Sequence, residues 1–109
     1  MTTEKTGTLR AERFLKGFHI SLRSPHEVGY FQHTISKASL ESLIRFVIKA
    51  HAQPREHTIE QSRERRIKLQ VKGSLAFILI KERGQEEEII AIGSLTRLIA
   101  QAQKWQRLL

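Results

Sequence analysis

Hydrophobic and polar residues alternate along residues 17 to 23, and this alternation predicts a β-strand. Phe18, Ile20 and Leu22 would face a core, while the residues between them would face solvent. Pro25 follows the alternating segment. Because proline cannot donate a hydrogen bond to a neighbouring strand, Pro25 predicts that the strand ends there.

Two amphipathic helices are predicted after the proline. The first covers residues 26 to 35, and the second covers about 40 to 52, with Ser39 as its N-cap. The apolar residues at helical spacing are Val28, Phe31 and Ile35 in the first helix and Leu40, Leu43, Ile44, Val47 and Ile48 in the second. One strand and two short helices cannot bury their apolar faces alone. The segment therefore predicts a homodimer in which two strands pair as an antiparallel ribbon over four helices.

The C-terminal part of the chain has a different pattern, typical of three strands and a helix. Residues 67 to 72 alternate, residues 75 to 80 form a continuous apolar run, and residues 89 to 92 predict a third strand. We expect the apolar run to be buried on both faces. Ser94 would cap a final helix. Its apolar stripe comprises Leu95, Leu98, Ile99, Ala102 and Trp105.

These elements predict an α+β fold with four parts. Residues 1–16 would be a flexible basic arm, with a helical turn over 9–16 as the other reading. Residues 17–53 would form the strand-helix-helix unit, and residues 54–66 a charged linker or solvated helix. Residues 67–109 would form a small antiparallel β-meander followed by the C-terminal helix.

Charge is the strongest indication of a partner. The chain of 109 residues carries 19 Lys and Arg against 11 Asp and Glu, a formal net charge of +8. Such an excess favours a polyanion, most often nucleic acid. The chain has no cysteine, which excludes disulfides and thiolate chemistry and fits the cytoplasm. No apolar run approaches the roughly 20 residues of a membrane-spanning helix.

The exposed positions of the predicted strand are the candidate DNA-reading residues. His19, Ser21 and Arg23 would project from one face. The guanidinium of Arg23 could donate two hydrogen bonds to a guanine edge in the major groove.

Three further cations precede the strand and are candidate phosphate contacts. They are Arg10, Arg13 and Lys16, all in the predicted arm. Basic arms of this kind follow the phosphate backbone or enter a minor groove.

Two segments, HISLRSPHEV and SLESLIRFVIKAH, resemble the ribbon-helix-helix family of DNA-binding proteins, which includes Arc-like and MetJ-like repressors. The resemblance covers about residues 17–51. It implies that His19, Ser21 and Arg23 read base edges and that the backbone N–H groups of Ser39 and Leu40 hold a phosphate. The implied function is a homodimeric, sequence-specific, DNA-binding transcription regulator. Repression and activation, dimer and tetramer, and an antitoxin or plasmid-transfer role all stay open.

Two alternatives belong to other classes. The segment RRIKLQVKGSLAFILIKERGQEEEIIAIG is similar in layout to RelE/ParE-like toxins, some of which are RNases. A basic adaptor that contacts another protein through its C-terminal unit is the second alternative. No Ser-His-Asp set, paired carboxylates or phosphate-binding loop appears, so we expect no enzyme activity. His26 and His33 lack the spacing of a zinc helix, so we expect neither a metal nor a cofactor.

Overall fold

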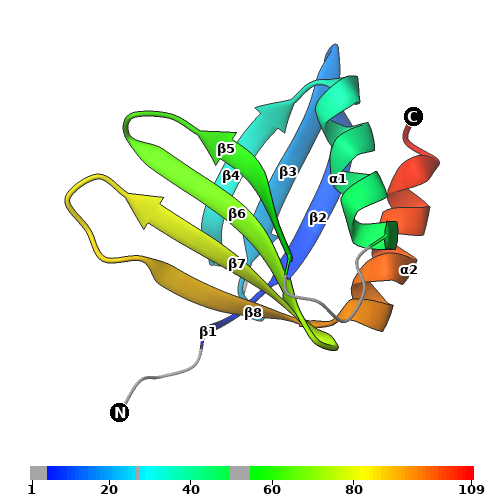
Figure 1. Cartoon of the computed structure of the whole chain (residues 1–109). Coiled ribbons are helices and arrows are strands. Elements are labelled where there is room, and N and C mark those ends of the chain that lie inside the picture. Colours follow the sequence, from blue (N-terminus) through cyan, green and yellow to red (C-terminus); the bar gives the residue numbers. More distant parts are fainter. Residues whose placement is uncertain (1–4, 27, 50–54) are drawn as a thin grey trace.

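Two β-sheets and two helices make up the part of the chain that the structure, a computed structural model, describes: residues 5–26, 28–49 and 55–109 (Figure 1). In chain order, the elements are β1 (Lys5–Thr6), β2 (Thr8–Phe14), β3 (Gly17–Arg23), β4 (Gly29–Ile35), α1 (Lys37–Lys49), β5 (Arg55–Gln61), β6 (Arg65–Lys72), β7 (Leu75–Glu82), β8 (Glu88–Ser94) and α2 (Leu95–Gln106). The order is four strands and a helix, followed by four strands and a helix. The two halves of the chain therefore have the same order of elements.

The first half forms a three-stranded antiparallel sheet in the order β2-β3-β4. The predicted strand at residues 17–23 is present as β3, and it lies at the centre of this sheet. Its apolar residues, Phe18, Ile20 and Leu22, are buried. β3 pairs with β2 on one side and with β4 on the other, so both of its edges are occupied within one chain.

The second half forms most of a five-stranded sheet in the order β1-β8-β7-β6-β5. Its three antiparallel strands β6, β7 and β8 match the predicted C-terminal meander. Ser94 caps α2, since its side chain accepts a hydrogen bond of 3.2 Å from the backbone N–H of Arg97. β1 comes from the first half of the chain and pairs in parallel with β8.

The predicted ribbon-helix-helix unit is wrong. Residues 29–35 form strand β4 in place of the predicted first helix, and four strands precede helix α1. Because both edges of β3 are already paired, no edge is left for the strand of a second copy. Phe31 and Ile35 are buried on one face of β4, with His33 between them on that face. The polar His33 interrupted the period of two, so the apolar residues resembled a helix.

Two more segments differ from the sequence-based expectation. Residues 8–14 of the predicted arm form β2, in which Leu9 is buried. Residues 55–61 of the predicted linker form the edge strand β5. Both strands carry few apolar residues, and backbone pairing with the next strand stabilises them. The predictions for residues 1–4 and 50–54 lie outside the described residues.

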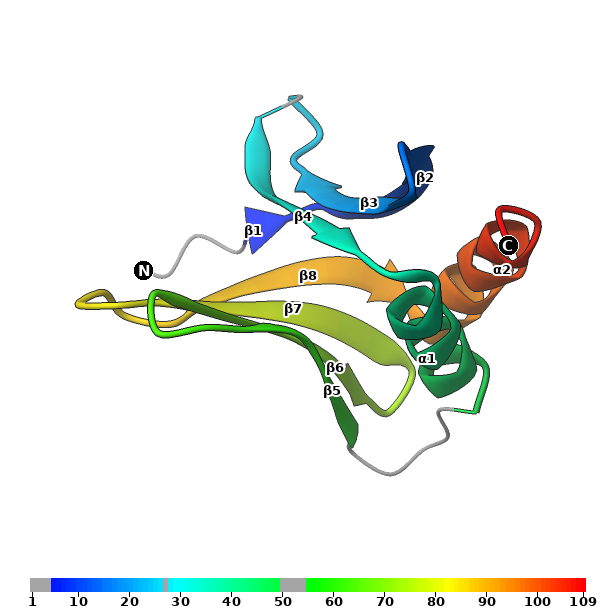
Figure 2. The same ribbon diagram turned by 90° about the horizontal axis from the view of Figure 1, so that it is seen from above.

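The helices lie together at one end of the two sheet layers (Figure 2). Each buries one apolar stripe: Leu40, Leu43, Ile44 and Val47 in α1, and Leu98, Ala102 and Trp105 in α2. Both stripes belong to a single hydrophobic core shared by the two sheets. Among the described residues, no helix is long and apolar enough to span a membrane.

An ion cluster joins the two sheets away from the helices. The Glu60 carboxylate accepts hydrogen bonds from Arg65 at 2.5 Å (Nε) and 2.8 Å (Nη2), and its Oε1 lies 2.7 Å from His33 Nδ1. Arg65 Nη2 also donates to the backbone oxygen of Gln32 at 3.3 Å. His33 and Gln32 belong to β4, whereas Glu60 and Arg65 belong to β5 and β6. The cluster therefore connects the three-stranded sheet to the five-stranded sheet.

Candidate nucleic-acid interface

The structure places the three predicted base-reading residues on one face of β3. His19, Ser21 and Arg23 alternate with the buried residues, and each is partly exposed. They point away from the core, on the outer face of the three-stranded sheet. The alternation in the sequence was sufficient to bring them together on one face.

Strand β2 adds further polar side chains to this outer face. Arg10 is the register partner of Ser21, Thr8 of Arg23, and Glu12 of His19. Arg10 was predicted as part of a flexible arm, but it lies on a paired strand and its side chain is exposed. Two arginines are thus held on adjacent strands, and Glu12 is the acidic member of the face.

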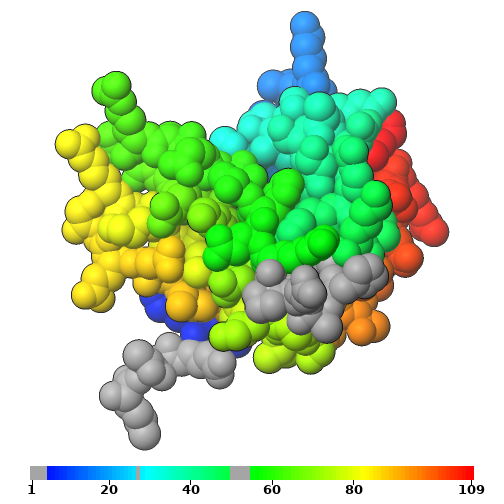
Figure 3. All heavy atoms as spheres, viewed as in Figure 1, coloured from blue at the N-terminus to red at the C-terminus, as the bar shows by residue number. Residues whose placement is uncertain are grey.

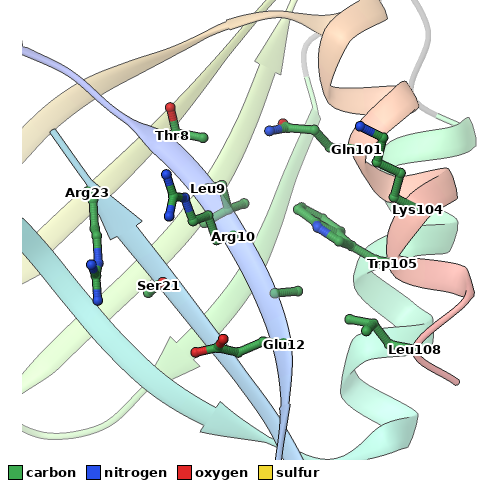
Figure 4. A pocket seen from close by; sticks show the side chains of 11 residues that line it. Thr8, Leu9, Arg10, Glu12, Ser21, Arg23, Gln101, Lys104, Trp105 and Leu108 are labelled. Carbon is green, nitrogen blue, oxygen red and sulfur yellow. The ribbon is translucent and has the colours of Figure 1, made fainter. Parts of the chain in front are cut away.

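A groove of about 520 Å³ runs along this face and beside helix α2. Figure 4 shows Arg10 and Arg23 on one side of it and Gln101, Lys104 and Trp105 of α2 on the other. In Figure 2 the strands β2 and β4 curl away from the five-stranded sheet, so the three-stranded sheet is curved. Arg10, Arg23 and Lys104 outnumber Glu12 among the lining residues, and the groove is therefore basic.

An aromatic pair lies on the same outer face. The ring centroids of Phe14 and His19 are 4.7 Å apart, and the rings are tilted by 39°. Phe14 is 44% exposed. A ring that remains accessible beside cations can stack on a nucleobase.

The remaining predicted phosphate contacts have different positions. Arg13 Nε donates a 2.8 Å hydrogen bond to the backbone oxygen of Leu108, so this arginine holds the segment that follows α2. Lys16 lies exposed in the turn between β2 and β3.

The N–H groups predicted to clamp a phosphate are used within helix α1. The cap of this helix is Ser36, which precedes the predicted Ser39: its side-chain oxygen accepts from the Ser39 N–H at 3.2 Å. The Leu40 N–H donates to the Ser36 backbone oxygen at 3.0 Å, and the Leu40 side chain is buried. Neither N–H group is available to an external phosphate.

The outer face of the five-stranded sheet is a second polar and aromatic surface, which the sequence did not predict. Phe77 of β7 lies between its register partners Gln70 of β6 and Ala91 of β8. Lys68 and Lys81 lie on the same face, beside two apolar side chains that are about half exposed, Leu75 at 50% and Ile89 at 56%. Strands β5 to β8 lie at the front in Figure 3, so this face is turned toward the viewer.

The two outer faces are equivalent by register. The β2–β3 hairpin closes with the pair Phe14 and Gly17, and the β6–β7 hairpin closes with Lys72 and Leu75. Residues at the same distance in sequence from their turns occupy equivalent positions. Three such pairs are His19 and Phe77, Arg10 and Lys68, and Arg23 and Lys81. Each face therefore carries one central ring with one cation on the neighbouring strand and another on the ring's own strand.

Within residues 5–26, 28–49 and 55–109, no three His, Cys, Asp or Glu side chains are grouped as a metal site would require. Comparisons with models of protein families, with curated proteins and with solved structures found no match.

Proposed function

We propose that this protein binds single-stranded nucleic acid across the outer faces of its two sheets. The observation that carries the proposal is the repetition of one arrangement, a ring with two cations, at equivalent positions of both halves. Open β-sheets that bind single strands combine aromatic side chains, on which bases stack, with cations along the backbone. The net charge of +8 supports a polyanionic ligand.

The geometry favours a single strand over a duplex. Stacking on Phe14, His19 or Phe77 requires an exposed base face, which a duplex hides within its stack. The outer face of the three-stranded sheet is a groove with α2 as a wall, and a hollow surface does not enter the major groove. The predicted two-chain ribbon would enter it, but the paired edges of β3 prevent that ribbon from forming.

Regulation of transcription stays a proposal within this function. It requires that the natural ligand be DNA and that the groove distinguish sequences. Ser21 and Gln32, which are register partners on the outer face, can donate or accept hydrogen bonds at exposed base edges. Arg23 can donate to a guanine edge in a single strand as it would in a duplex.

The first test is fluorescence anisotropy with labelled oligonucleotides at about 150 mM salt, where weak phosphate contacts are largely screened. We expect tighter binding to an unstructured DNA or RNA strand than to a duplex of equal length. Equal or weaker binding to the single strands would contradict the proposal.

Arg10→Ala should weaken this binding and make it less sensitive to salt. One lost phosphate contact lowers the slope of log K against log salt by about 0.7 for a single strand. The matched control is Arg45→Ala, because Arg45 is equally basic and exposed but lies on α1, away from both outer faces. An equal change in both variants would indicate an effect of net charge and would argue against the groove.

A further inference from the structure

The turn between β2 and β3 contains an unusual residue. Leu15 has a φ angle of 52°, and among the described residues it is the non-glycine residue with positive φ. Its side chain is 92% exposed, although leucine is a hydrophobic residue. A side chain in this backbone region costs roughly 1 kcal/mol or more, which glycine avoids. Leucine at this position therefore contributes no buried contact that would stabilise the fold.

The second half of the chain has an equivalent turn, between β6 and β7, in which glycine takes the place of leucine. Gly73 occupies the equivalent position in the β6–β7 hairpin, directly after the closing residue Lys72, and its φ angle is 64°. The two turns thus share a positive φ angle at this position, with glycine in one and leucine in the other. Because leucine is strained at a position that glycine occupies without strain, its presence points to a function of the side chain.

The surroundings of Leu15 indicate what that function is. It follows Phe14, whose ring contacts His19 on the outer face of the three-stranded sheet. The exposed Lys16 follows it in the turn. The hairpin is the uppermost part of the molecule in Figure 1, at the end of the groove face. An apolar side chain therefore stands beside a cation and an aromatic pair.

We infer that Leu15 is a wedge that inserts between two successive bases of the bound strand. This inference rests on the proposed function. Leucine is among the apolar side chains that enter base steps and unstack them. One base would stack on the Phe14 ring, the next would lie beyond Leu15, and the Lys16 ammonium would contact the intervening phosphate. Removal of the exposed leucine from water would offset its backbone strain.

The test compares Leu15→Gly with Leu15→Met, using a strand that contains two adjacent 2-aminopurines, whose fluorescence rises when they are unstacked. Wild type and Leu15→Met should increase the fluorescence. Leu15→Gly should abolish most of that increase and weaken binding on the order of tenfold, because the apolar contact between the leucine side chain and the bases is lost. Its thermal midpoint should equal or exceed that of wild type, because glycine relieves the strain.

Different results separate the wedge from the proposed function. If Leu15→Gly binds and unstacks the strand as wild type does, while Arg10→Ala still weakens binding, the wedge is wrong and the function stands. If wild type binds no single strand, both are wrong. A loss of binding to anionic lipid vesicles or to a protein partner in Leu15→Gly, with strand binding unchanged, would also overturn the wedge.

Discussion

The double variant His19→Ala with Phe77→Ala is expected to bind a long single strand at least about 30-fold more weakly than wild type, because two stacking contacts worth about 1 kcal/mol or more each are lost. The rings occupy equivalent positions on opposite outer faces. A strand of about 30 nucleotides can contact both faces, and its second contact then forms at high local concentration. Anisotropy titrations of the two single variants and the double variant measure the effect.

Two controls make this result specific. A strand of about 8 nucleotides, within the size range of a single sheet-based site, should contact one face. For this strand, the double variant should lose little more affinity than the single variant that alters the contacted face. Phe77→Leu retains an apolar side chain of similar size and removes the flat ring. If Phe77→Leu binds the long strand as tightly as wild type, base stacking on Phe77 is excluded.

Arg65→Met is expected to lower the free energy of unfolding, measured with urea, by about 2–3 kcal/mol. The substitution leaves the Glu60 carboxylate, whose side chain is 12% exposed, without its two hydrogen bonds from Arg65. Glu60→Gln keeps the shape of the side chain and removes its charge. The charge then left without its ionic partner is that of Arg65, which at 26% exposure is more accessible to water than Glu60. This substitution should therefore cost less, about 1 kcal/mol.

The double variant Arg65→Met with Glu60→Leu completes this test. Because it removes the charge together with its partner, it should recover part of the stability lost in Arg65→Met. A double variant less stable than Arg65→Met would mean that Glu60 stabilises the protein without Arg65, through its contact with His33 across the sheets.

The same cluster predicts how stability depends on pH. The hydrogen bond from Arg65 holds the pKa of Glu60 below its ordinary value of 4.5. The unfolded chain therefore takes up a proton first, and stability is lost as the pH falls through the folded pKa. Burial also lowers the pKa of His57 from 6.5, so some stability is lost below that pH as well. The difference between wild type and Arg65→Met should isolate Glu60, with a smaller acid-induced loss in the variant.

The sequence predicted the elements whose apolar pattern is regular and local. The alternation in β3 and β6, the apolar run in β7 and the serine cap of α2 could all be identified from neighbouring residues. Strand β4 could not, because its interior position is held by His33, whose partner Glu60 comes from another sheet. The edge strands β2 and β5 depend on pairing with neighbours more than on their own apolar residues.

Some residues of the candidate site could likewise be predicted from local sequence, and others could not. His19, Ser21 and Arg23 share a face because alternate residues of any strand do, so the pattern was sufficient. Lys104 joins the groove from α2, far along the chain, and no local signal predicts that. Phe77 was hidden in a continuous apolar run that suggested burial on both faces. Its cross-strand neighbour Gln70 was the one indication that the outer face is open.

Strand β1 gives the molecule the character of a dimer contained in one polypeptide. It belongs to the first half but completes the sheet of the second, through the register pairs Lys5 with Ile90 and Thr6 with Ala91 and a hydrogen bond of 3.0 Å from the Gly7 N–H to the Ala91 oxygen. Together with the packing of α1 on α2, this exchange links two similar halves. Because the halves are covalently joined, dilution cannot separate them.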